Sequence, residues 1–390
     1  MGQTVISAPQ VLTGGYYPYD PVKNPLGQKT WTQYYKGSYP TNLTTGTSGQ
    51  TIASRIIYGN GIYAFVSNQG VLYYSTDAKS WNIQYVGNQV FYCIEYGNSI
   101  WILAGNAGVL YSGTPGGTWT ARTSQFGGGA VIQDVRWLSG LSLFVAAGQP
   151  TSAGACAIST SSDGITWTNR LNDTNSQAYY NAINYDSSTN TVAVACGSST
   201  NNLYYSTNGT SWSVVNTGTN AYQVQFIKGA LNRWAGANNS YFSSTSANIG
   251  STWSSQNPLV HIQMNDNNLS ISQNIGGYPR AFWEMQYDSV NNYYYQICPP
   301  VLNTSSGISG FVPTLLTYDA STIQTTRYYS STSYVQGYPI IKAEPLIMSS
   351  LTAAYGAPLT IQEYAYLNGV HIYILFGAGA DNNLQIFTTA

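Results

Sequence analysis

Five tryptophans recur along the 390-residue chain, and each ends a short segment rich in small polar residues. Four of these segments read YYSTDAKSW (73–81), YSGTPGGTW (111–119), SSDGITW (161–167) and YYSTNGTSW (204–212). A longer segment, YFSSTSANIGSTW, ends at residue 253, so the tryptophans are spaced 38, 48, 45 and 41 residues apart. A repeat of about 40–50 residues is typical of folds that arrange copies of one small sheet around an axis.

Each repeat divides into four short stretches in which apolar and polar residues alternate. The first repeat (52–86) contains IASRIIY, IYAFVS, VLYYST and SWNIQYV, and the next four repeats divide in the same way. A sixth repeat is weaker and contains AFWEMQYD, YYYQICP, TLLTYD and IQTTRYY. Alternating runs joined by short turns that contain Gly and Asn predict antiparallel hairpins. The sequence therefore predicts an all-β propeller built from four-stranded antiparallel blades.

The two ends of the chain complement each other. After residue 358 only three strand-like stretches remain, LTIQEYAYL, VHIYILFG and LQIFTT, while KTWTQYY (29–35) stands alone near the N-terminus. Pairing this segment with the last three stretches would complete a blade and leave no open edge where the ring closes. We predict a seven-bladed β-propeller over residues 29–390, in which 29–35 is the outer strand of the last blade, and an extended N-terminal arm over residues 1–28.

Charged residues form only 7% of the chain, and the net charge is −1. A chain with so little positive charge lacks the electrostatic footprint of a nucleic-acid-binding protein. No stretch reaches the roughly 18 apolar residues of a membrane helix, and the N-terminus has neither the basic nor the apolar region of a signal peptide. We therefore expect no nucleic-acid partner and no membrane insertion. A net charge near zero gives little colloidal repulsion, which permits incorporation into a larger assembly.

The four cysteines, Cys93, Cys156, Cys196 and Cys298, lie far apart, and the chain has only two histidines. The chain has no Cys-x-x-Cys pair, so the sequence does not favour a zinc site. Cys93 and Cys196 lie in apolar, strand-like stretches. We expect all four thiols to be reduced and buried, and we expect neither a metal nor a cofactor.

The tryptophan-ended segments resemble the Asp-box, or BNR repeat, a Ser-x-Asp-x-Gly-x-x-Trp motif found with close variants in sialidases and many other propellers. Residues 161–167 match it best, the segment that ends at Trp212 has Asn in place of Asp, and the first segment has Ala78 in place of Gly. An Asp or Asn side chain bonds its own turn backbone, and Gly tolerates a positive φ angle. The resemblance implies structural hairpin turns, away from the face where sialidases bind substrate, at Asp77, Trp81, Trp119, Asp163, Gly164, Trp167, Asn208, Gly209 and Trp212.

Strand alternation sorts the connections of a propeller between two faces. The compact turns share one face with short first-to-second-strand turns such as GNG (59–61), whereas the long connections at 148–154, 256–280, 299–313 and 330–358 fall on the other. Long loops in compact domains are usually functional or disordered, and tyrosine suits interfaces with proteins and sugars. Unless these loops only cap the ring, we expect this long-loop face to bind a partner or receptor through Tyr278, Tyr334, Tyr338, Tyr355 and Met264.

The predicted innermost strands carry ionisable side chains that would border the central channel, namely Arg55, Glu95, Asp134, Arg136, Glu284 and Glu363. One interpretation is a solvated polar channel wall. The other is a glycosidase, which needs two carboxyl groups roughly 5–10 Å apart. The three-arginine set of sialidases cannot be assembled from the sequence, and Arg55-Ile56-Ile57 replaces their Arg-Ile-Pro signature. We therefore predict no catalytic residues and a protein that is not an enzyme.

The low charge and the abundance of Tyr, Asn, Thr, Ser and Gly resemble the composition of tail and fibre proteins of tailed phages. The resemblance implies a non-enzymatic structural or binding component of a phage virion, tail-associated and assembled in the host cytoplasm, that acts in assembly or host-surface attachment. Its partners would be other virion proteins, contacted through the N-terminal arm and the long-loop face, and a host surface glycan. The alternatives are a carbohydrate-binding lectin or adhesin, a glycosidase, and an assembly factor similar to the Asp-box propellers of photosynthetic biogenesis.

Overall fold

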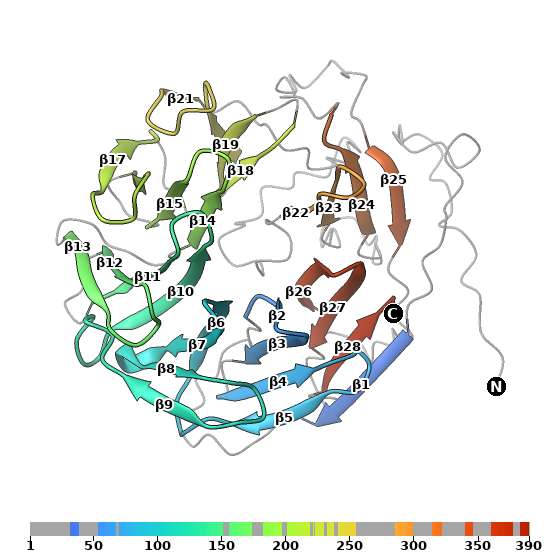
Figure 1. Ribbon diagram of the computed structural model, residues 1–390. Helices are drawn as coiled ribbons and strands as arrows, with labels where there is room; N and C mark the ends of the chain where they lie inside the picture. The colour runs from blue at the N-terminus through green and yellow to red at the C-terminus, as the bar shows by residue number, and fades with distance from the viewer. Residues whose placement is uncertain are drawn as a thin grey trace, which may run out of the picture.

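The computed structural model describes residues 32–38, 54–67, 70–150, 156–173, 182–196, 201–218, 221, 223–229, 232–237, 241–254, 285–298, 314–321, 340–345, 360–376 and 383–389. Within these ranges the chain forms 28 strands and one short 3-10 helix, η1 (Asn106–Gly108). The strands group into seven four-stranded antiparallel sheets, which lie side by side around a central opening (Figure 1). The predicted all-β propeller with four-stranded antiparallel blades is therefore confirmed.

Each sheet is one blade. In the six blades built from consecutive strands the first strand lies nearest the centre of the ring, and in the last blade β26 takes this innermost position (Figure 1). Blade 1 contains β2 (Ile57–Gly59), β3 (Ile62–Ser67), β4 (Val71–Ser75) and β5 (Asn82–Tyr85). Blade 2 contains β6 (Phe91–Gly97), β7 (Ile100–Gly105), β8 (Leu110–Gly113) and β9 (Trp119–Arg122). Blade 3 contains β10 (Val131–Leu138), β11 (Leu143–Gln149), β12 (Cys156–Ser161) and β13 (Thr168–Asp173).

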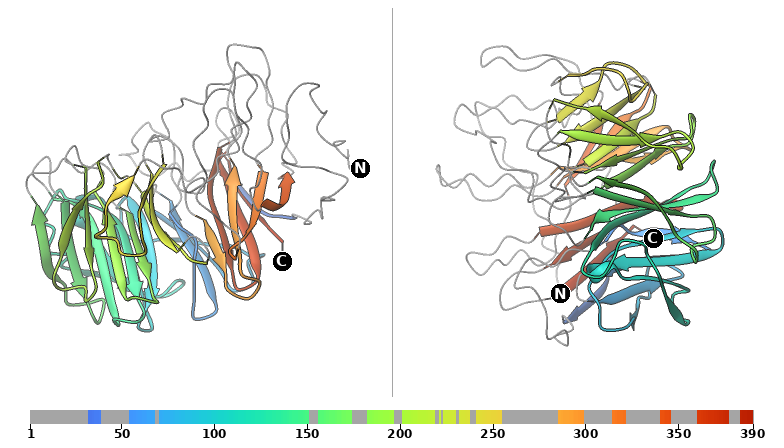
Figure 2. Two further views of the ribbon diagram at one scale, coloured as in Figure 1. Left: turned by 90° about the horizontal axis from the view of Figure 1, so that it is seen from above. Right: turned by 90° about the vertical axis from the view of Figure 1, so that its left-hand side faces the viewer.

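The remaining blades follow in chain order, and the strands of all blades run across the thickness of the ring (Figure 2). Blade 4 contains β14 (Ala182–Asp186), β15 (Thr191–Ala195), β16 (Asn202–Ser206) and β17 (Ser213–Asn216). Blade 5 contains β18 (Gln223–Ile227), β19 (Arg233–Ala237), β20 (Tyr241–Ser244) and β21 (Trp253–Ser254). Blade 6 contains β22 (Gln286–Asp288), β23 (Tyr293–Cys298), β24 (Thr314–Asp319) and β25 (Ile340–Pro345).

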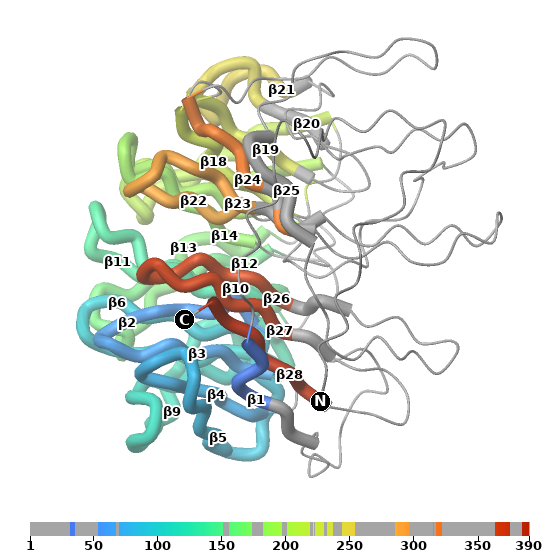
Figure 3. Tube along the Cα trace, turned by 90° about the vertical axis from the view of Figure 1, so that its right-hand side faces the viewer, coloured from blue at the N-terminus to red at the C-terminus, as the bar shows by residue number. Residues whose placement is uncertain are grey.

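The last blade combines both ends of the chain. Its inner strands are β26 (Thr360–Leu367), β27 (Val370–Phe376) and β28 (Asn383–Thr388), and its outer strand is β1 (Thr32–Ser38). β1 lies antiparallel beside β28, from Thr32↔Thr388 to Ser38↔Asn383 (Figure 3). The N-terminal strand thus closes the ring as the sequence predicted. It ends three residues later than predicted because its pairing with β28 continues to Ser38, while residues 29–31 lie outside the described residues.

The outer strand of blade 6 differs from the predicted one. The sequence placed it at 323–329, but β24 pairs with β25, from Thr314↔Pro345 to Tyr318↔Ile340. Two strand-like stretches follow β24, and alternation alone does not decide which of them pairs. Residues 340–345 therefore form a strand where a loop was predicted over 330–358, and residues 323–329 lie outside the described part of the chain.

Apolar clusters fill the spaces between neighbouring blades. Between blades 2 and 3, Ile102 and Leu110 pack in one cluster with Val135, Phe144 and Trp167. Equivalent clusters join blade 7 to blade 1, blade 1 to blade 2, blade 3 to blade 4 and blade 4 to blade 5. Because successive side chains of a strand point to opposite faces of its sheet, each blade can contribute to the clusters on both of its sides.

The innermost strand of every blade carries an aromatic residue near its end, a feature that the sequence analysis missed. A Cβ atom added to Gly59 in blade 1 would lie 2.2 Å from Tyr96 Cδ1 in blade 2, and one added to Gly97 would lie 2.3 Å from Trp137 in blade 3. Glycine is therefore required at these two positions, because a side chain would overlap the neighbouring ring. The aromatic residues are Tyr58, Tyr96, Trp137, Tyr185, Phe226, Tyr287 and Tyr366.

Candidate functional site

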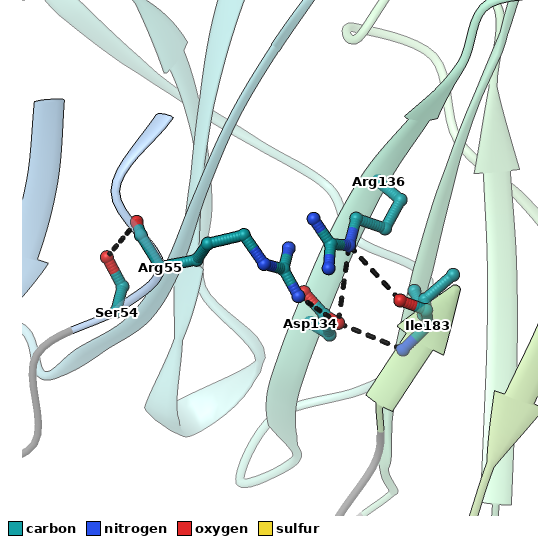
Figure 4. A network of polar contacts seen from close by, with 5 residues as sticks. All are labelled: Ser54, Arg55, Asp134, Arg136 and Ile183. Atoms are coloured by element: carbon teal, nitrogen blue, oxygen red, sulfur yellow. Dashed lines mark hydrogen bonds and ion pairs between the residues drawn. The ribbon is translucent and has the colours of Figure 1, made fainter. Parts of the chain in front are cut away.

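A charged network lies at the centre of the ring, where three blades meet (Figure 4). Arg55 precedes β2 in blade 1, and its Nη2 atom lies 3.4 Å from Oδ2 of Asp134, on β10 in blade 3. Arg136 Nε, two residues further along β10, lies 3.8 Å from the same oxygen. The side chain of Asp134 is fully buried, and that of Arg55 is nearly so. The structure therefore brings three of the predicted channel residues together.

The network continues into the next blade. The backbone N–H of Ile183, on β14 in blade 4, donates a hydrogen bond to Asp134 Oδ2 at 2.9 Å. Arg136 Nε donates to the carbonyl oxygen of Ile183 at 3.1 Å. Asp134 Oδ2 thus faces donors from blades 1, 3 and 4 at once, and it joins their innermost strands (Figure 4).

Polar side chains on later inner strands bond the following blade in the same way. Asn184 Oδ1, on β14, accepts a hydrogen bond from the Phe226 N–H in blade 5 at 3.0 Å. Gln225, on β18, donates to the Met285 carbonyl at 2.6 Å and accepts from the Met285 N–H at 3.0 Å. In the sequence, Asn184 and Gln225 each directly precede the aromatic residue of their innermost strand. These side chains hold neighbouring blades together around the channel.

Glu95 lies on β6 in blade 2, between the blades that supply Arg55 and Asp134. Its Oε1 atom accepts a hydrogen bond from the Tyr96 N–H at 2.9 Å. Burial raises the pKa of Glu95 to about 8, although the Arg55 guanidinium and the Tyr96 N–H favour the ionised form, and the charge of Asp134 adds to the rise. Glu95 is therefore mostly protonated at neutral pH.

The raised pKa of Glu95 predicts a pH dependence of stability. The folded protein holds this proton more tightly than the unfolded chain, so the stabilisation is complete below pH 4.5 and is lost as the pH rises through 8. The urea midpoint of the wild type should fall between about pH 5 and about pH 9. The Glu95→Gln variant cannot ionise at this position and should show a flatter profile. Parallel profiles for the two proteins would contradict the assigned pKa.

Two further channel residues were predicted. Glu363 lies buried on β26 in blade 7, which adjoins blade 1 on the side away from blade 2. Glu284 lies outside the described residues. The carboxyl groups of Glu95 and Asp134 both lie near Arg55, and Asp134 Oδ2 is engaged by donors from three blades. The arrangement joins blades, and its carboxyl groups are buried, which differs from the solvated channel wall expected from the sequence.

The compact turns between third and fourth strands are held by their own side chains. Asp163 Oδ1 accepts hydrogen bonds from the backbone N–H groups of Ile165 and Thr166, both at 2.8 Å, and from the Ser161 hydroxyl at 2.8 Å. The Gly164 N–H donates to Ser161 Oγ, and Gly164 has a φ of 68°. Backbone donation, chiefly from Thr166, lowers the pKa of Asp163 to about 2. The residue types of the motif are thus explained by bonds within the turn.

Two further turns repeat this geometry. Asn208 Oδ1 accepts from the N–H groups of Thr210 and Ser211, both at 2.9 Å. Asp77 Oδ1 accepts from the N–H groups of Lys79 and Ser80, and these bonds lower the pKa of Asp77 to about 2. The residue after Asp77 is Ala78 rather than Gly, and it adopts the same left-handed backbone with a φ of 58°.

The tryptophan of each turn packs against the preceding blade. Trp81 lies in the cluster shared by blades 7 and 1, Trp119 in that of blades 1 and 2, and Trp167 in that of blades 2 and 3. Trp212 and Trp253 lie in the next two clusters around the ring. The repeated tryptophan therefore joins neighbouring blades, as large aromatic side chains do when they bury most of their surface.

Asp163 and Asn208 supply a matched test of the turn. Asp163→Ala removes the acceptor of three hydrogen bonds and should cost about 1–2 kcal/mol of unfolding free energy. Asp163→Asn keeps the Oδ1 acceptor, as Asn208 does in blade 4, and should cost less than about 0.5 kcal/mol. Urea denaturation at neutral pH measures both variants. Equal losses in the two variants would show that charge, and not the hydrogen-bond pattern, stabilises the turn.

The prediction that all four cysteines are reduced is wrong for two of them. Cys156 and Cys196 form a disulfide, with Cα atoms 6.0 Å apart, and Cys93 is buried outside this disulfide. The sequence separation of 40 residues is close to one repeat, so the two cysteines reach adjacent blades. Distance along the chain had suggested isolation, whereas the ring brings successive repeats into contact. Among the described residues, no group of three His, Cys, Asp or Glu side chains could hold a metal ion.

The predicted binding residues Met264, Tyr278, Tyr334, Tyr338 and Tyr355 lie outside the described residues, as does the N-terminal arm.

Comparison with known proteins places the chain among propellers. No protein-family model matches the sequence, and no curated protein matches it. The chain is similar to the solved structure "YCF48 bound to D1 peptide", with 11% identity and a TM-score of 0.52, over 93% of this chain and 97% of that chain. It is also similar to the β-propeller domain of Cps50 (Swd1) from Myceliophteria thermophila, with 7% identity and a TM-score of 0.48, over 88% of this chain and 98% of that chain. At such identities the likeness shows the fold alone. No helix within the described ranges is long and apolar enough to cross a membrane.

Proposed function

We propose that this protein is a non-enzymatic structural or binding component of a phage virion, associated with the tail, that acts in assembly or in attachment to the host surface. The observation that carries the proposal is that its polar side chains form hydrogen bonds within the ring itself. Asp134, Asn184 and Gln225 bond the backbone of neighbouring blades, and Asp163 and Asn208 bond their own turns. Groups used in this way produce a rigid ring, and binding is then a property of its surfaces.

The ring is, in this proposal, a seven-bladed Asp-box propeller. In three turns a Ser lies two residues before an Asp or Asn. In each turn the Oδ1 atom of that Asp or Asn accepts hydrogen bonds from two backbone N–H groups. The Trp at the end of each turn packs between blades. The shared hydrogen bonds support the resemblance to the Asp-box, because a chance match in sequence would not give three turns the same hydrogen-bond geometry.

The surface chemistry supports assembly with other proteins. The outer strand β5 exposes 40% of Ile83 and 59% of Tyr85, and the outer strand β17 exposes 53% of Val214. These strands carry no charged residue, and uncharged strand edges pair readily with other chains. We propose the N-terminal arm (1–28) and the long-loop face as the contacts with other virion proteins. The similar propeller YCF48 is described as bound to a peptide, which supports an extended segment as one kind of partner.

The location in the virion can be tested directly. Mass spectrometry of purified phage particles should detect this chain in stoichiometric amounts, and labelled antibodies should mark the tail in electron micrographs. A matched preparation of lysate proteins, passed through the same purification without particles, controls for carry-over. Absence of the chain from purified particles would contradict the proposal.

The binding face can be tested in the same particles. Replacing Tyr278 and Tyr355 together by Ala should lower incorporation or host attachment while leaving the unfolding midpoint unchanged, because both residues lie in connections between blades. Ile165→Ala is the matched control on the compact-turn side, where Ile165 is 43% exposed. A loss of attachment in the Ile165 variant alone would place the contact on the opposite face.

A carbohydrate-binding lectin or adhesin is the second candidate. The observation in its favour is the exposed ring of Tyr85, close to the half-buried Tyr35 of β1, since sugars stack on such rings. A glycan array probed with purified protein distinguishes the two candidates. Binding that is lost in Tyr85→Ala, with incorporation into particles unchanged, would favour the lectin. Hydrolysis of a glycoside that is lost in Glu95→Gln would instead favour the glycosidase.

A further inference from the structure

A disulfide joins two neighbouring blades. Cys156 is the first residue of β12 in blade 3, and Cys196 directly follows β15 in blade 4. Their Cα atoms are 6.0 Å apart, which is within the usual range for a disulfide. Both residues are fully buried in the apolar cluster that also contains Ile158 and Val194.

The topology of the ring explains why these two residues meet. The end of a second strand and the start of a third strand lie at the same edge of a blade, because the two strands are antiparallel neighbours. Cys196 and Cys156 occupy these positions in adjacent blades, at a separation of 40 residues. Cys93 lies instead on an innermost strand, β6, where its thiol contacts the Ala104 carbonyl. Cys93 is therefore an internal reference for a buried cysteine outside this disulfide.

We propose that Cys156 and Cys196 are an oxidation site: the ring forms with two thiols, and when the interface between blades 3 and 4 opens transiently in an oxidising medium, these thiols become a covalent cross-link between the two blades. One cysteine thiolate attacks a small-molecule disulfide, such as glutathione disulfide, and displaces one glutathione thiolate. The second cysteine thiolate attacks the protein sulfur of the mixed disulfide and displaces the other. Two protein thiols are oxidised, and one glutathione disulfide is reduced to two glutathione molecules.

Burial determines how long the disulfide persists. Thiol–disulfide exchange requires a thiolate to reach one of the two sulfurs, and both sulfurs lie within the packed cluster between the blades. Oxidation by glutathione disulfide and reduction must therefore both wait for this interface to open. Disulfides persist in oxidising surroundings and are rare in reducing cytosol, so the cross-link suits a protein that acts outside the cell in which it was made. The inference does not rest on the proposed virion function.

The test compares oxidised and reduced protein of the full chain. Purified protein is incubated with glutathione disulfide or with a reductant in urea below its unfolding transition, so that the interface between blades 3 and 4 opens transiently. It is then quenched in acid, alkylated after denaturation and digested. The oxidised sample should yield a linked pair of peptides that contain Cys156 and Cys196, with Cys93 alkylated. Its Tm should exceed that of the reduced sample by about 5 °C, because the bond closes a 40-residue loop.

Two variants show which cysteines cause the difference in Tm. The Cys156→Ala/Cys196→Ala double variant should lose the difference in Tm between oxidised and reduced samples, and Cys93→Ala should keep it. Alkylated Cys156 and Cys196 in the oxidised sample, or a linkage of either one to Cys298, would overturn the proposal. Equal Tm values for oxidised and reduced wild type would also overturn it. The peptide analysis and the Tm comparison of the wild type therefore test the proposal even if the double variant does not fold. Neither outcome bears on whether the chain is found in particles, which the virion experiment reports separately.

Discussion

A chain that lacks residues 1–38 should unfold at a much lower urea concentration than the full chain, or lose its cooperative transition. The deletion removes β1, which pairs with β28 from Thr32↔Thr388 to Ser38↔Asn383. It also removes Tyr35, which packs edge-on against Tyr73 of blade 1 at 5.9 Å. The lost strand hydrogen bonds and buried apolar surface together should cost roughly 5 kcal/mol, a large part of the stability of a typical domain.

A shorter deletion is the control for ring closure. Removing residues 1–28 deletes the predicted arm but leaves β1, so the urea midpoint should stay close to that of the full chain. Tyr35→Ala, which keeps the strand pairing, should lie between the two deletions. If the protein without residues 1–38 unfolded like the full chain, the pairing of β1 with β28 would not be what closes the ring.

The second large effect is expected at Asp134. Asp134→Ala should cost about 3–5 kcal/mol of unfolding free energy, because it removes the carboxylate that the buried Arg55 and the partly buried Arg136 face. Arg55 and Asp134 are 7% and 0% exposed, so water cannot replace the lost partner easily. The Ile183 N–H also loses its acceptor. Urea denaturation of the purified variant measures the loss.

Two further variants separate charge from hydrogen bonding at Asp134. Asp134→Asn keeps an acceptor for the Ile183 N–H but removes the negative charge, and its loss should be smaller than that of Asp134→Ala. Arg55→Met combined with Asp134→Asn should be less destabilised than the sum of the single variants, because the two residues are coupled. A loss below about 1 kcal/mol in Asp134→Ala would mean that the network is not structural.

The sequence determined those parts of the structure that depend on residues close together in the chain. Alternation with a period of two predicted most of the strands, and the Ser, Asp or Asn, and Trp pattern predicted the compact turns. In these turns Asp163 bonds residues only two and three positions away. The count of strand-like stretches at the two ends also predicted that an N-terminal strand completes the last blade, because an unpaired sheet edge at the junction would be costly.

The candidate site was predicted only as a set of residues, and its contacts were decided by the tertiary structure. Arg55 reaches past blade 2 to Asp134, 79 residues away, and Asp134 bonds Ile183 in the following blade. Which inner strands approach one another depends on the closure of the ring, which no local pattern encodes. The choice of 340–345 as the outer strand of blade 6 has the same origin, because two stretches had the right periodicity and only pairing with β24 selected one.

The cysteines show the same division most clearly. The sequence placed Cys196 in an apolar, strand-like stretch, and the predicted burial of Cys156 and Cys196 is confirmed. Their pairing required that the end of one blade's second strand meet the start of the preceding blade's third strand, which is a property of the ring and not of either segment. Local sequence therefore determined strands, turns and burial, because these depend on neighbours along the chain. The tertiary structure alone decided the bonds between blades, because these depend on which repeats the closed ring places side by side.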